Sequence, residues 1–276
     1  MAERRELQPG DELGPYRLEA LLGEGGMGIV FRARGDDGSE VALKVLKLEL
    51  GGDLMFQHRF KQEARAAAEV SDPNLLPIIE TGEADGRHYL ASAYAPGGSL
   101  TDRLASGALA PAEAVSVACG VAAGLDALHA AGVVHRDVKP SNVLFGADGT
   151  PMLTDFGLAK GRAYTVLTRP GQVLGTLDYL APELIRGEPA TPASDIYALG
   201  CVAYECVAGR APFSDRSVFE VGLAHLEETP DPPAPDAPDL CAAVLAALEK
   251  DADSRPASAG AYAELLRRAV PEATAA

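Results

Sequence analysis

Three glycines, Gly23, Gly25 and Gly28, lie in the stretch LLGEGGMGIVFRA with the spacing G-x-G-x-x-G. The spacing alone is weak, because dinucleotide-binding folds, other nucleotide-binding loops and chance turns all contain it. In a dinucleotide-binding turn the glycines open a helix, and an acidic residue follows about 20 positions later. Here residues 29–31 continue as an apolar strand, and the Asp-Gly pair at 37–38 predicts a hairpin turn into the strand VALKVL. We therefore expect a strand–turn–strand hairpin whose backbone N–H groups can approach the oxygens of a nucleotide phosphate.

The periodic segments of the chain predict two lobes of different character. Residues 16–94 are mostly strand-like, with one amphipathic helix predicted within 55–70. A long alanine-rich helix that begins at a proline is expected over 111–131, and mainly helix is expected from residue 225 onward. The proline-rich stretch 229–239 reads as an extended linker between two of these later helices. A small sheet-rich lobe followed by a larger helical lobe is the simplest account.

The length and charge of the chain narrow the class of protein. With 276 residues, 47% of them hydrophobic, each lobe can bury a core of its own. The formal net charge of -16 argues against general affinity for nucleic acid or anionic lipid. The best candidate for a membrane span, residues 115–134, is interrupted by Asp126 and His129. The first residues also lack the apolar core of a signal peptide, so we expect a cytoplasmic chain or the cytoplasmic part of a longer protein.

Cysteine spacing gives no sign of a metal site or a disulfide framework. The four cysteines form no C-x-x-C pair and lie in segments rich in alanine and valine. We expect them to be small buried side chains. They are Cys119, Cys201, Cys206 and Cys241.

A lysine within the apolar strand VALKVL needs a partner for its charge. Lys44 alternates with apolar residues in this strand, and a charged group on a mostly buried strand is costly unless it is paired. Glu63, on the helix predicted next, is the natural candidate. The alternative is a lysine that reaches out to solvent along its alkyl stem.

Two further motifs complete a recognisable set. VVHRDVKPSNVLF contains Asp137, Lys139 and Asn142, and LTDFGLAK contains Asp155. Together with the glycine loop and Lys44, in this order and at compatible spacing, these motifs resemble those of the protein kinases of the serine/threonine class. Within that class the chain is most similar to the bacterial eukaryotic-like (Hanks-type) kinases.

The resemblance implies a fold of the α+β class with two lobes. The N-lobe would be a small antiparallel sheet with one regulatory helix, and the C-lobe would be larger and mainly helical. The kinase domain is expected at 16–271, after an N-terminal extension of residues 1–15. Within it we expect the N-lobe at about 16–93, the hinge at about 94–98 and the C-lobe at about 99–271.

The resemblance also implies a reaction, the transfer of the γ-phosphoryl group of ATP to serine or threonine hydroxyls of proteins. Catalysis of this transfer chiefly positions groups and neutralises charge. Asp137 would orient the acceptor hydroxyl and receive its proton, and Lys139 would contact the transferring phosphoryl group. Lys44 would hold the α- and β-phosphates and be kept in place by Glu63.

The cofactors implied are ATP and Mg²⁺, with Mn²⁺ as an alternative. Asn142 and Asp155 would supply the hard oxygen ligands that Mg²⁺ prefers. Leu22 and Val30 would bracket the adenine. The ATP contacts implied by the resemblance are Leu22, Gly23, Glu24, Gly25, Gly26, Met27, Gly28, Val30, Ala42, Lys44, Ser92, Ala93, Tyr94, Ala95, Asp102 and Leu144.

The predicted hinge departs from the usual family pattern. Ser92 falls at the gatekeeper position, where many relatives carry a bulky residue, and Ala93 replaces a residue that is often acidic. One hypothesis is an enlarged pocket behind the adenine. The alternatives are a slip of one residue in the alignment or filling of the space by neighbouring side chains.

Other motif residues are expected to shape the peptide platform and the catalytic loop. Thr176 would contact Asp137 and Lys139, as in serine/threonine kinases. Glu183 of the APE motif would pair with a buried Arg255, and Asp195 would anchor the backbone of the catalytic loop.

Regulation is expected through the activation segment, because Arg136 precedes the catalytic aspartate. A phosphate on Thr168, or else on Thr165, could bind Arg136 together with Lys160 or Arg162. The alternative for either threonine is a merely solvated loop residue.

Two other functions are weighed against an active protein kinase. A pseudokinase would bind nucleotide or a partner without transfer, although each catalytic position is present here. A small-molecule phosphotransferase could share the catalytic loop, but the stretch GTLDYLAPE and Arg255 favour a peptide platform. Pairing of two copies through the N-lobe is a further expectation, drawn from relatives rather than from a motif in this chain.

Overall fold

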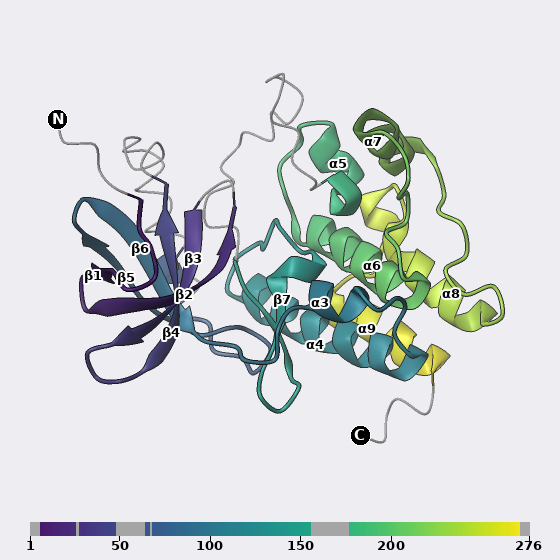
Figure 1. Ribbon diagram of the computed structural model, residues 1–276. Helices are drawn as coiled ribbons and strands as arrows, with labels where there is room; N and C mark the ends of the chain where they lie inside the picture. The colour runs from purple at the N-terminus through teal and green to yellow at the C-terminus, as the bar shows by residue number, and fades with distance from the viewer. Residues whose placement is uncertain (1–5, 26–27, 48–63, 67, 156–176, 271–276) are drawn as a thin grey trace. The chain divides into compact units, whose positions relative to one another are not determined.

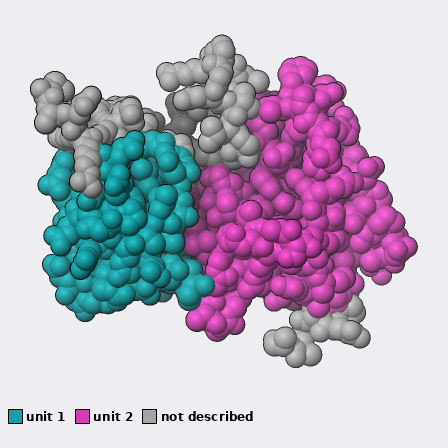
Figure 2. Space-filling model, viewed as in Figure 1, with its two compact units in different colours: residues 1–71, 76–96 teal, residues 72–75, 97–276 magenta. Residues whose placement is uncertain are grey.

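The computed structural model describes residues 6–25, 28–47, 64–66, 68–155 and 177–270 (Figure 1). The chain divides into two compact units, coloured separately in Figure 2. Unit 1 comprises residues 1–71 and 76–96, and unit 2 comprises residues 72–75 and 97–276.

The described residues of unit 1 form an antiparallel six-stranded sheet with the order β1-β2-β3-β4-β6-β5. Its strands are β1 (Glu12–Leu13), β2 (Tyr16–Glu24), β3 (Gly28–Gly35), β4 (Glu40–Leu46), β5 (Ile78–Ala84) and β6 (Arg87–Ala93). The turn predicted at 37–38 joins β3 to β4, and Gly38 there adopts a left-handed φ of 84°. A residue without Cβ takes up this conformation at little steric cost.

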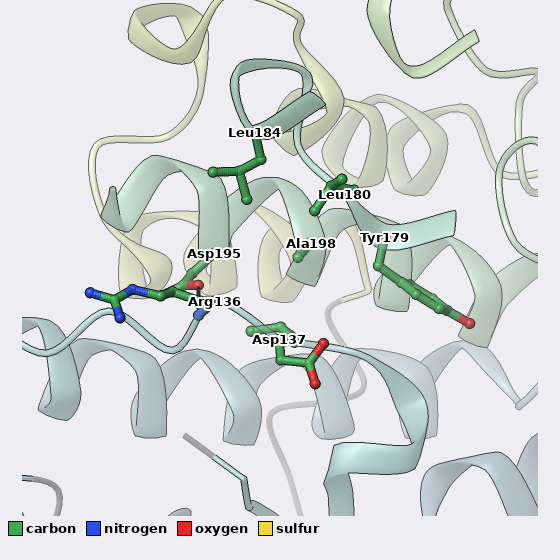
Figure 3. A pocket seen from close by; sticks show the side chains of 8 residues that line it. Arg136, Asp137, Tyr179, Leu180, Leu184, Asp195 and Ala198 are labelled. Carbon is green, nitrogen blue, oxygen red and sulfur yellow. Dashed lines mark hydrogen bonds between the residues drawn. The ribbon is translucent and has the colours of Figure 1, made fainter. Parts of the chain in front are cut away.

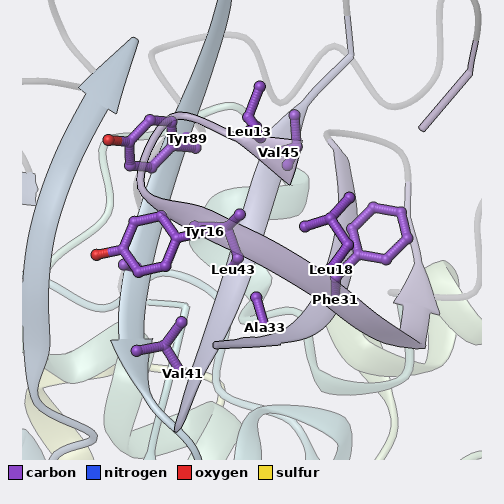
Figure 4. Packing of buried hydrophobic residues seen from close by; sticks show 10 residues of the cluster. Leu13, Tyr16, Leu18, Phe31, Ala33, Val41, Leu43, Val45 and Tyr89 are labelled. Atoms are coloured by element: carbon purple, nitrogen blue, oxygen red, sulfur yellow. The ribbon is translucent and has the colours of Figure 1, made fainter. Parts of the chain in front are cut away.

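One face of this sheet carries the hydrophobic core of unit 1 (Figure 4). Alternation along β4 turns Val41, Leu43 and Val45 toward this core, because successive side chains of a strand point to opposite faces. The ring of Tyr16 on β2 meets that of Tyr89 on β6 edge-on, with 5.7 Å between centroids. The core therefore joins strands from both halves of the sheet.

The segment before residue 16 also contributes to unit 1. β1 pairs with β2, and Leu13 is fully buried in the same core. The hydroxyls of Tyr16 and Tyr89 both donate to Glu80 Oε1, at 3.0 and 3.1 Å. The Tyr16 bond links β2 to β5, an edge strand of the sheet, and the Tyr89 bond links β6 to β5.

Unit 2 is mainly helical, with a short β7–β8 hairpin. Its longer elements are α3 (Leu100–Leu104), α4 (Pro111–Ala130), β7 (Val143–Phe145), β8 (Pro151–Leu153), α5 (Pro182–Ile185), α6 (Pro192–Ala208), α7 (Val218–Glu227), α8 (Pro238–Leu245) and α9 (Ala259–Ala269). The 3₁₀ turns among the described residues of this unit are η1 (Pro140–Asn142), η2 (Leu177–Tyr179), η3 (Ala246–Leu248) and η4 (Ala252–Ser254).

Helices α4 and α6 form the centre of unit 2. α6 begins at Pro192, which tolerates the first helical position, and ends before Gly209, whose φ of 72° closes the helix. α4 packs on α6, on α9 and on β8. The helix predicted over 111–131 is therefore confirmed. The linker predicted at 229–239 is confirmed over 229–237, whereas its last two residues, Pro238 and Asp239, begin α8.

Burial explains two apolar features of unit 2. All four cysteines are free and buried, as their apolar surroundings predicted. In the described part of the chain, α4 is long and apolar enough to cross a membrane by length and composition alone. Half of its apolar window, 50%, is buried against the rest of the structure, which is the packing of a core helix.

Candidate active site

The β7–β8 hairpin brings two predicted magnesium ligands to one place. Val143 pairs with Leu153, and the backbone N–H of Thr154 donates to the carbonyl of Asn142 at 2.9 Å. Asp155 follows Thr154 directly. The strand register thus places Asn142 and Asp155 on neighbouring segments, although they are 13 positions apart in sequence.

Asp137 is held by two of the residues predicted to act with it. Its Oδ2 lies 2.9 Å from Lys139 Nζ. The side-chain amide of Asn142 donates to the Asp137 carbonyl at 2.8 Å and to its Oδ2 at 3.1 Å. The carboxylate, an ammonium and an amide therefore converge within one short loop.

His135 is buried beneath this loop as a neutral ring. Its Nδ1 accepts the backbone N–H of Asp137 at 3.2 Å, so the ring proton lies on Nε2 and is donated to the Thr154 carbonyl at 3.0 Å. Burial lowers the pKa of His135 below its ordinary value, against the opposing effect of nearby carboxylates. The ring therefore joins the catalytic loop to the segment that carries Asp155.

Asp195, buried at the start of α6, fixes the backbone of the catalytic loop. Its two carboxylate oxygens accept the N–H groups of His135 and Arg136, each at 2.8 Å. Figure 3 labels Asp195 and Arg136. Asp195 Oδ2 also lies 2.8 Å from His129 Nε2, and since a carboxylate only accepts, the ring N–H donates. One side chain thus collects three hydrogen bonds from α4 and from the loop.

Two of the four non-glycine residues with positive φ in the described part of the chain lie at the predicted catalytic site. Arg136 has φ 66° and Asp155 has φ 60°, conformations that residues with a Cβ rarely adopt. Such strain persists only where the surroundings enforce it, and it is common at functional sites. Here the backbone N–H of Arg136 donates to Asp195 and that of Thr154 donates to Asn142, and these bonds supply that enforcement.

The predicted pair of Glu183 and Arg255 is present and buried. Two parallel hydrogen bonds of 2.8 Å join the guanidinium to both carboxylate oxygens, and Ser194 Oγ donates to Glu183 Oε1 at 2.7 Å. Burial alone would raise the pKa of Glu183, but the hydrogen bonds from Arg255 and Ser194 outweigh it and hold the pKa below its ordinary value. The pair ties α5 to the turn after η4.

A hollow opens beside Asp137 within unit 2 (Figure 3). Most of its lining is apolar. The lining residues are Arg136, Asp137, Val138, Tyr179, Leu180, Leu184, Asp195 and Ala198. The hydroxyl of Tyr179 donates to Glu205 Oε2 at 2.6 Å, which orients the ring at the edge of the hollow.

In unit 1, four predicted ATP contacts share one face of the sheet. Val30 lies opposite Lys44 across β3 and β4, and Ala42 lies opposite Ser92 across β4 and β6. Directly opposed residues point to the same side, and Ala42 and Lys44 are two positions apart on β4. This face is the one turned away from the core side chains Leu43 and Val45.

The three glycines of the loop differ in what the fold requires of them. A Cβ at Gly28 would lie 2.3 Å from the Val45 carbonyl, so the close approach of β3 and β4 excludes a side chain there. A Cβ at Gly23 or Gly25 would meet no atom within 4 Å. Packing therefore does not explain why glycine is present at positions 23 and 25. A ligand held close against the backbone would explain it. These positions fit the phosphates of a nucleotide.

The donor set near Asp155 fits a magnesium ion held jointly with phosphates. Among the described residues no three His, Cys, Asp or Glu side chains cluster as a metal site. Asn142 and Asp155 offer one amide and one carboxylate, and Mg²⁺ commonly takes one or two protein ligands beside phosphate oxygens and water. A nucleotide would therefore have to complete the coordination.

The remaining predicted site residues are distributed over both units. Tyr94 and Ala95 follow β6, which ends at Ala93, while Leu144 lies on β7. Asp102 lies in the first turn of α3 and completes the capping box of Ser99, whose N–H and hydroxyl donate to Asp102 Oδ2 at 2.8 and 2.7 Å. Leu22, 46% exposed, lies on β2.

Several predictions fall outside the described residues. They concern the loop residues Gly26 and Met27, the lysine partner Glu63, and the activation-segment residues Lys160, Arg162, Thr165, Thr168 and Thr176. Of the helix predicted within 55–70, the structure describes 64–66 and 68 as helical.

Sequence reasoning missed two contributors to the site. In the sequence His129 only interrupts an apolar run, yet in the structure it hydrogen-bonds Asp195. Its position six residues before His135, at the end of α4, is the signal that could have revealed it. Ser194, immediately before Asp195, supports Glu183, and nothing in its local sequence indicates that contact.

Comparison with known proteins agrees with this geometry. A family model of the protein kinase domain matches residues 16–264. The chain therefore belongs to the protein kinase domain family, as its motifs predicted.

The relatives are bacterial serine/threonine-protein kinases. PknJ of Mycobacterium tuberculosis is 39% identical over 269 residues, which cover 94% of this chain and 46% of PknJ. PkwA of Thermomonospora curvata, a probable serine/threonine-protein kinase, is 40% identical over 263 residues, covering 94% of this chain and 35% of PkwA. The chain thus spans less than half the length of these relatives.

A solved structure confirms the predicted fold class. The crystal structure of the PknI kinase domain of Mycobacterium tuberculosis matches with a TM-score of 0.77 and 28% identity. The match covers 96% of this chain and 100% of that chain. The α+β kinase fold, with a sheet-based N-lobe and a helical C-lobe, is therefore established for this chain.

Proposed function

We propose that this chain transfers the γ-phosphoryl group of ATP to serine or threonine hydroxyls of proteins. The observation that carries the proposal is the environment of Asp137. Its carboxylate meets Lys139 and Asn142 on a loop that Asp195 fixes by two backbone hydrogen bonds. Such preorganisation is what phosphoryl transfer requires of a protein.

The residues of the loop have distinct roles in this proposal. Asp137 Oδ2, placed by Asn142, accepts a hydrogen bond from the acceptor hydroxyl and then takes its proton. Lys139, now 2.9 Å from that oxygen, turns its ammonium toward the transferring phosphoryl group and offsets its charge. Lys44, on the face shared with Val30 and Ala42, holds the α- and β-phosphates.

Magnesium is the metal that suits the predicted ligands, and Mn²⁺ is the alternative. When bound, the ion neutralises charge on the phosphate oxygens of ATP. Asn142 and Asp155 would hold it, one through an amide oxygen and the other through a carboxylate. Addition of EDTA should abolish turnover, and Mg²⁺ in excess should restore it.

The apolar hollow beside Asp137 supports a peptide as the acceptor. A side chain next to the acceptor serine or threonine could pack against the mouth of this hollow, which Tyr179, Leu180 and Leu184 line. A small-molecule acceptor would not need this surface. We therefore expect protein substrates with an apolar residue adjacent to the acceptor.

A set of matched peptides tests which hydroxyl accepts the phosphoryl group. Purified protein with Mg²⁺ and labelled ATP is offered matched peptides that differ only in Ser, Thr or Tyr at the acceptor. Labelling of the Ser and Thr peptides alone supports the proposal. Labelling of the Tyr peptide alone, or of metabolites but no peptide, overturns it.

Regulation and location remain part of the proposal. Arg136 could bind a phosphate on Thr168 or Thr165, so mass spectrometry after incubation with Mg-ATP should find one of them modified. A protein that is phosphorylated at other residues but at neither threonine would contradict this assignment.

Two copies of the chain could pair through the N-lobe and phosphorylate each other. The use of ATP as a substrate suits a cytoplasmic location.

A further inference from the structure

An ion pair joins the two strands on either side of β3 at the glycine loop. Glu24 is the last residue of β2, and Lys47 follows the end of β4. Glu24 Oε1 lies 2.8 Å from Lys47 Nζ. Glu24 on β2 is opposite Ile29 on β3, and Ile29 is opposite Val45 on β4, two residues before Lys47. The ion pair therefore crosses the first residues of β3.

The pair lies on the face of the sheet opposite to Lys44. Ile29 and Val45 contact the core of unit 1, and their direct partner Glu24 points to the same side. The next set of opposed residues across these strands is Gly23, Val30 and Lys44. Side chains at these positions point to the other face of the sheet. The Glu24 carboxylate is therefore behind the loop rather than on the face predicted to meet phosphates.

The loop needs a restraint at this point. The close approach to Val45 fixes Gly28, but no atom lies within 4 Å of a Cβ position at Gly23 or Gly25. Glycine also has more backbone freedom to lose than other residues. On the β2 side the backbone N–H of Gly25 donates to the Gly28 carbonyl at 2.9 Å, directly beside Glu24.

We infer that the Glu24–Lys47 pair is a positioning clamp, which holds the end of β2 so that the backbone at Gly23 and Gly25 is preorganised for nucleotide phosphates. This inference rests on the proposed function, because it assigns a residue pair to the ATP site. Glu24 was expected among the ATP contacts of the loop. In this inference the backbone of Glu24 can still contact ATP, while the side chain of Glu24 pairs with Lys47.

The expected size of the effect follows from exposure. The side chains of Lys47 and Glu24 are 33% and 57% exposed, and exposed ion pairs typically contribute about 0.2–1 kcal/mol. A free-energy difference in this range changes a dissociation constant by roughly 1.4- to 5-fold. Loss of the pair should therefore raise KM for ATP within this range and change kcat less than twofold.

A charge exchange tests the clamp by rescue. Glu24→Lys and Lys47→Glu are made singly and together, and KM for ATP and kcat are measured with Mg²⁺ and one peptide. Each single variant should raise KM for ATP about 2- to 5-fold, and the double variant should return it to within twofold of the original. A double variant whose KM is the product of the single effects overturns the clamp.

A matched control separates the clamp from loss of any surface pair. Arg34 Nε lies 2.7 Å from Glu19 Oε1 in the same unit, with exposure of 47% and 24%. Arg34→Gln should leave KM for ATP unchanged, whereas Lys47→Gln should raise it. Equal effects of the two changes would also overturn the clamp.

Hydrogen exchange provides a readout that does not need turnover. In nucleotide-free protein, amides of residues 21–31 should exchange faster in each single variant and at the original rate in the charge-exchanged double variant. If no protein turns over ATP but this pattern appears, the clamp stands and the proposed function fails. If turnover is normal and exchange is unaltered by the single changes, the clamp fails and the proposed function stands.

Discussion

Asp195 Oδ1 accepts the backbone N–H of Arg136 at 2.8 Å, and Asp195 Oδ2 accepts that of His135 at the same distance. Two consecutive amides, immediately before Asp137, are therefore fixed by one carboxylate from α6. Arg136 adopts a left-handed φ of 66° within this contact. The geometry of the catalytic loop depends on a helix about 60 positions further along the chain.

Asp195→Asn should lower both activity and stability. An asparagine offers one acceptor oxygen and one amide donor group, so one of the two backbone N–H groups loses its partner. A buried unsatisfied donor costs about 1–3 kcal/mol, and the loop before Asp137 loses its fixed position. We expect kcat to fall at least tenfold, together with a lower midpoint of thermal unfolding.

Asp126→Asn is the matched control for this prediction. Asp126 also accepts two consecutive backbone N–H groups, those of Ala259 and Gly260, at 3.0 and 2.9 Å. They belong to the start of α9 and not to the catalytic loop. Asp126→Asn should destabilise the fold with kcat within twofold of the original. An equal loss of kcat in both variants would attribute the effect to instability alone.

Glu183→Gln should give a pH-dependent loss of stability. The pKa of Glu183 in the folded protein lies below its ordinary value of 4.5, because of hydrogen bonds from Arg255 and Ser194 that outweigh burial. The carboxylate therefore stabilises the fold fully above pH 4.5, and this contribution disappears as the pH falls through the lowered pKa. At neutral pH the substitution should cost about 3–5 kcal/mol, since it leaves the guanidinium of Arg255 with a neutral partner.

Urea unfolding of both proteins from about pH 7 down to about pH 3 measures this difference. The gap in unfolding free energy should be constant at neutral pH and shrink below pH 4.5. Glu264→Gln, which alters an exposed pair with Arg268 on α9, should show no such gap. A gap independent of pH throughout would contradict the assignment.

The glycines of the loop should respond differently to substitution. Gly28→Val forces a Cβ against the Val45 carbonyl, so the midpoint of thermal unfolding should fall by several degrees. Gly25→Val meets no atom within 4 Å of its Cβ, so folding should be little changed while KM for ATP rises and turnover falls. Unchanged kinetics in Gly25→Val would contradict the assignment of this loop to the phosphates.

Ser92 should determine which ATP analogues are accepted. Its side chain is small and buried, with Oγ 3.4 Å from the Ala42 carbonyl that it faces across β4 and β6. If the space behind the adenine is enlarged, the protein should turn over N6-benzyl-ATP, and Ser92→Met should lose this analogue but retain ATP. Turnover of ATP without turnover of the analogue in the original protein contradicts the hypothesis.

The sequence predicted the family and the fold because its motifs are specific as a set. The hairpin of β3 and β4 and the helix α4 follow from local signals, namely an Asp-Gly turn and a proline-initiated apolar run. These features depend on neighbouring residues only, so one sequence is enough to predict them.

Long-range relationships were harder to obtain from the sequence. His129 hydrogen-bonds a residue 66 positions away, and no periodicity indicates such a contact. The bulge in β2 between Leu21 and Gly23 decides which face Glu24 occupies, since a shift of one residue moves a side chain to the opposite face. Only the register of three strands reveals the pair with Lys47.

The central claim is that Asp137 carries phosphoryl transfer, and one comparison tests it most directly. Transfer of label from γ-labelled ATP to a serine or threonine peptide is measured for the original protein, Asp137→Asn and Asp215→Asn. Asp215 is exposed and, with φ 67°, its left-handed backbone suits an asparagine equally well. We predict that Asp137→Asn loses at least a hundredfold in kcat while calorimetry still detects ATP binding, and that Asp215→Asn behaves like the original protein. Equal transfer by Asp137→Asn, or ATP binding without transfer by the original protein, would contradict the account.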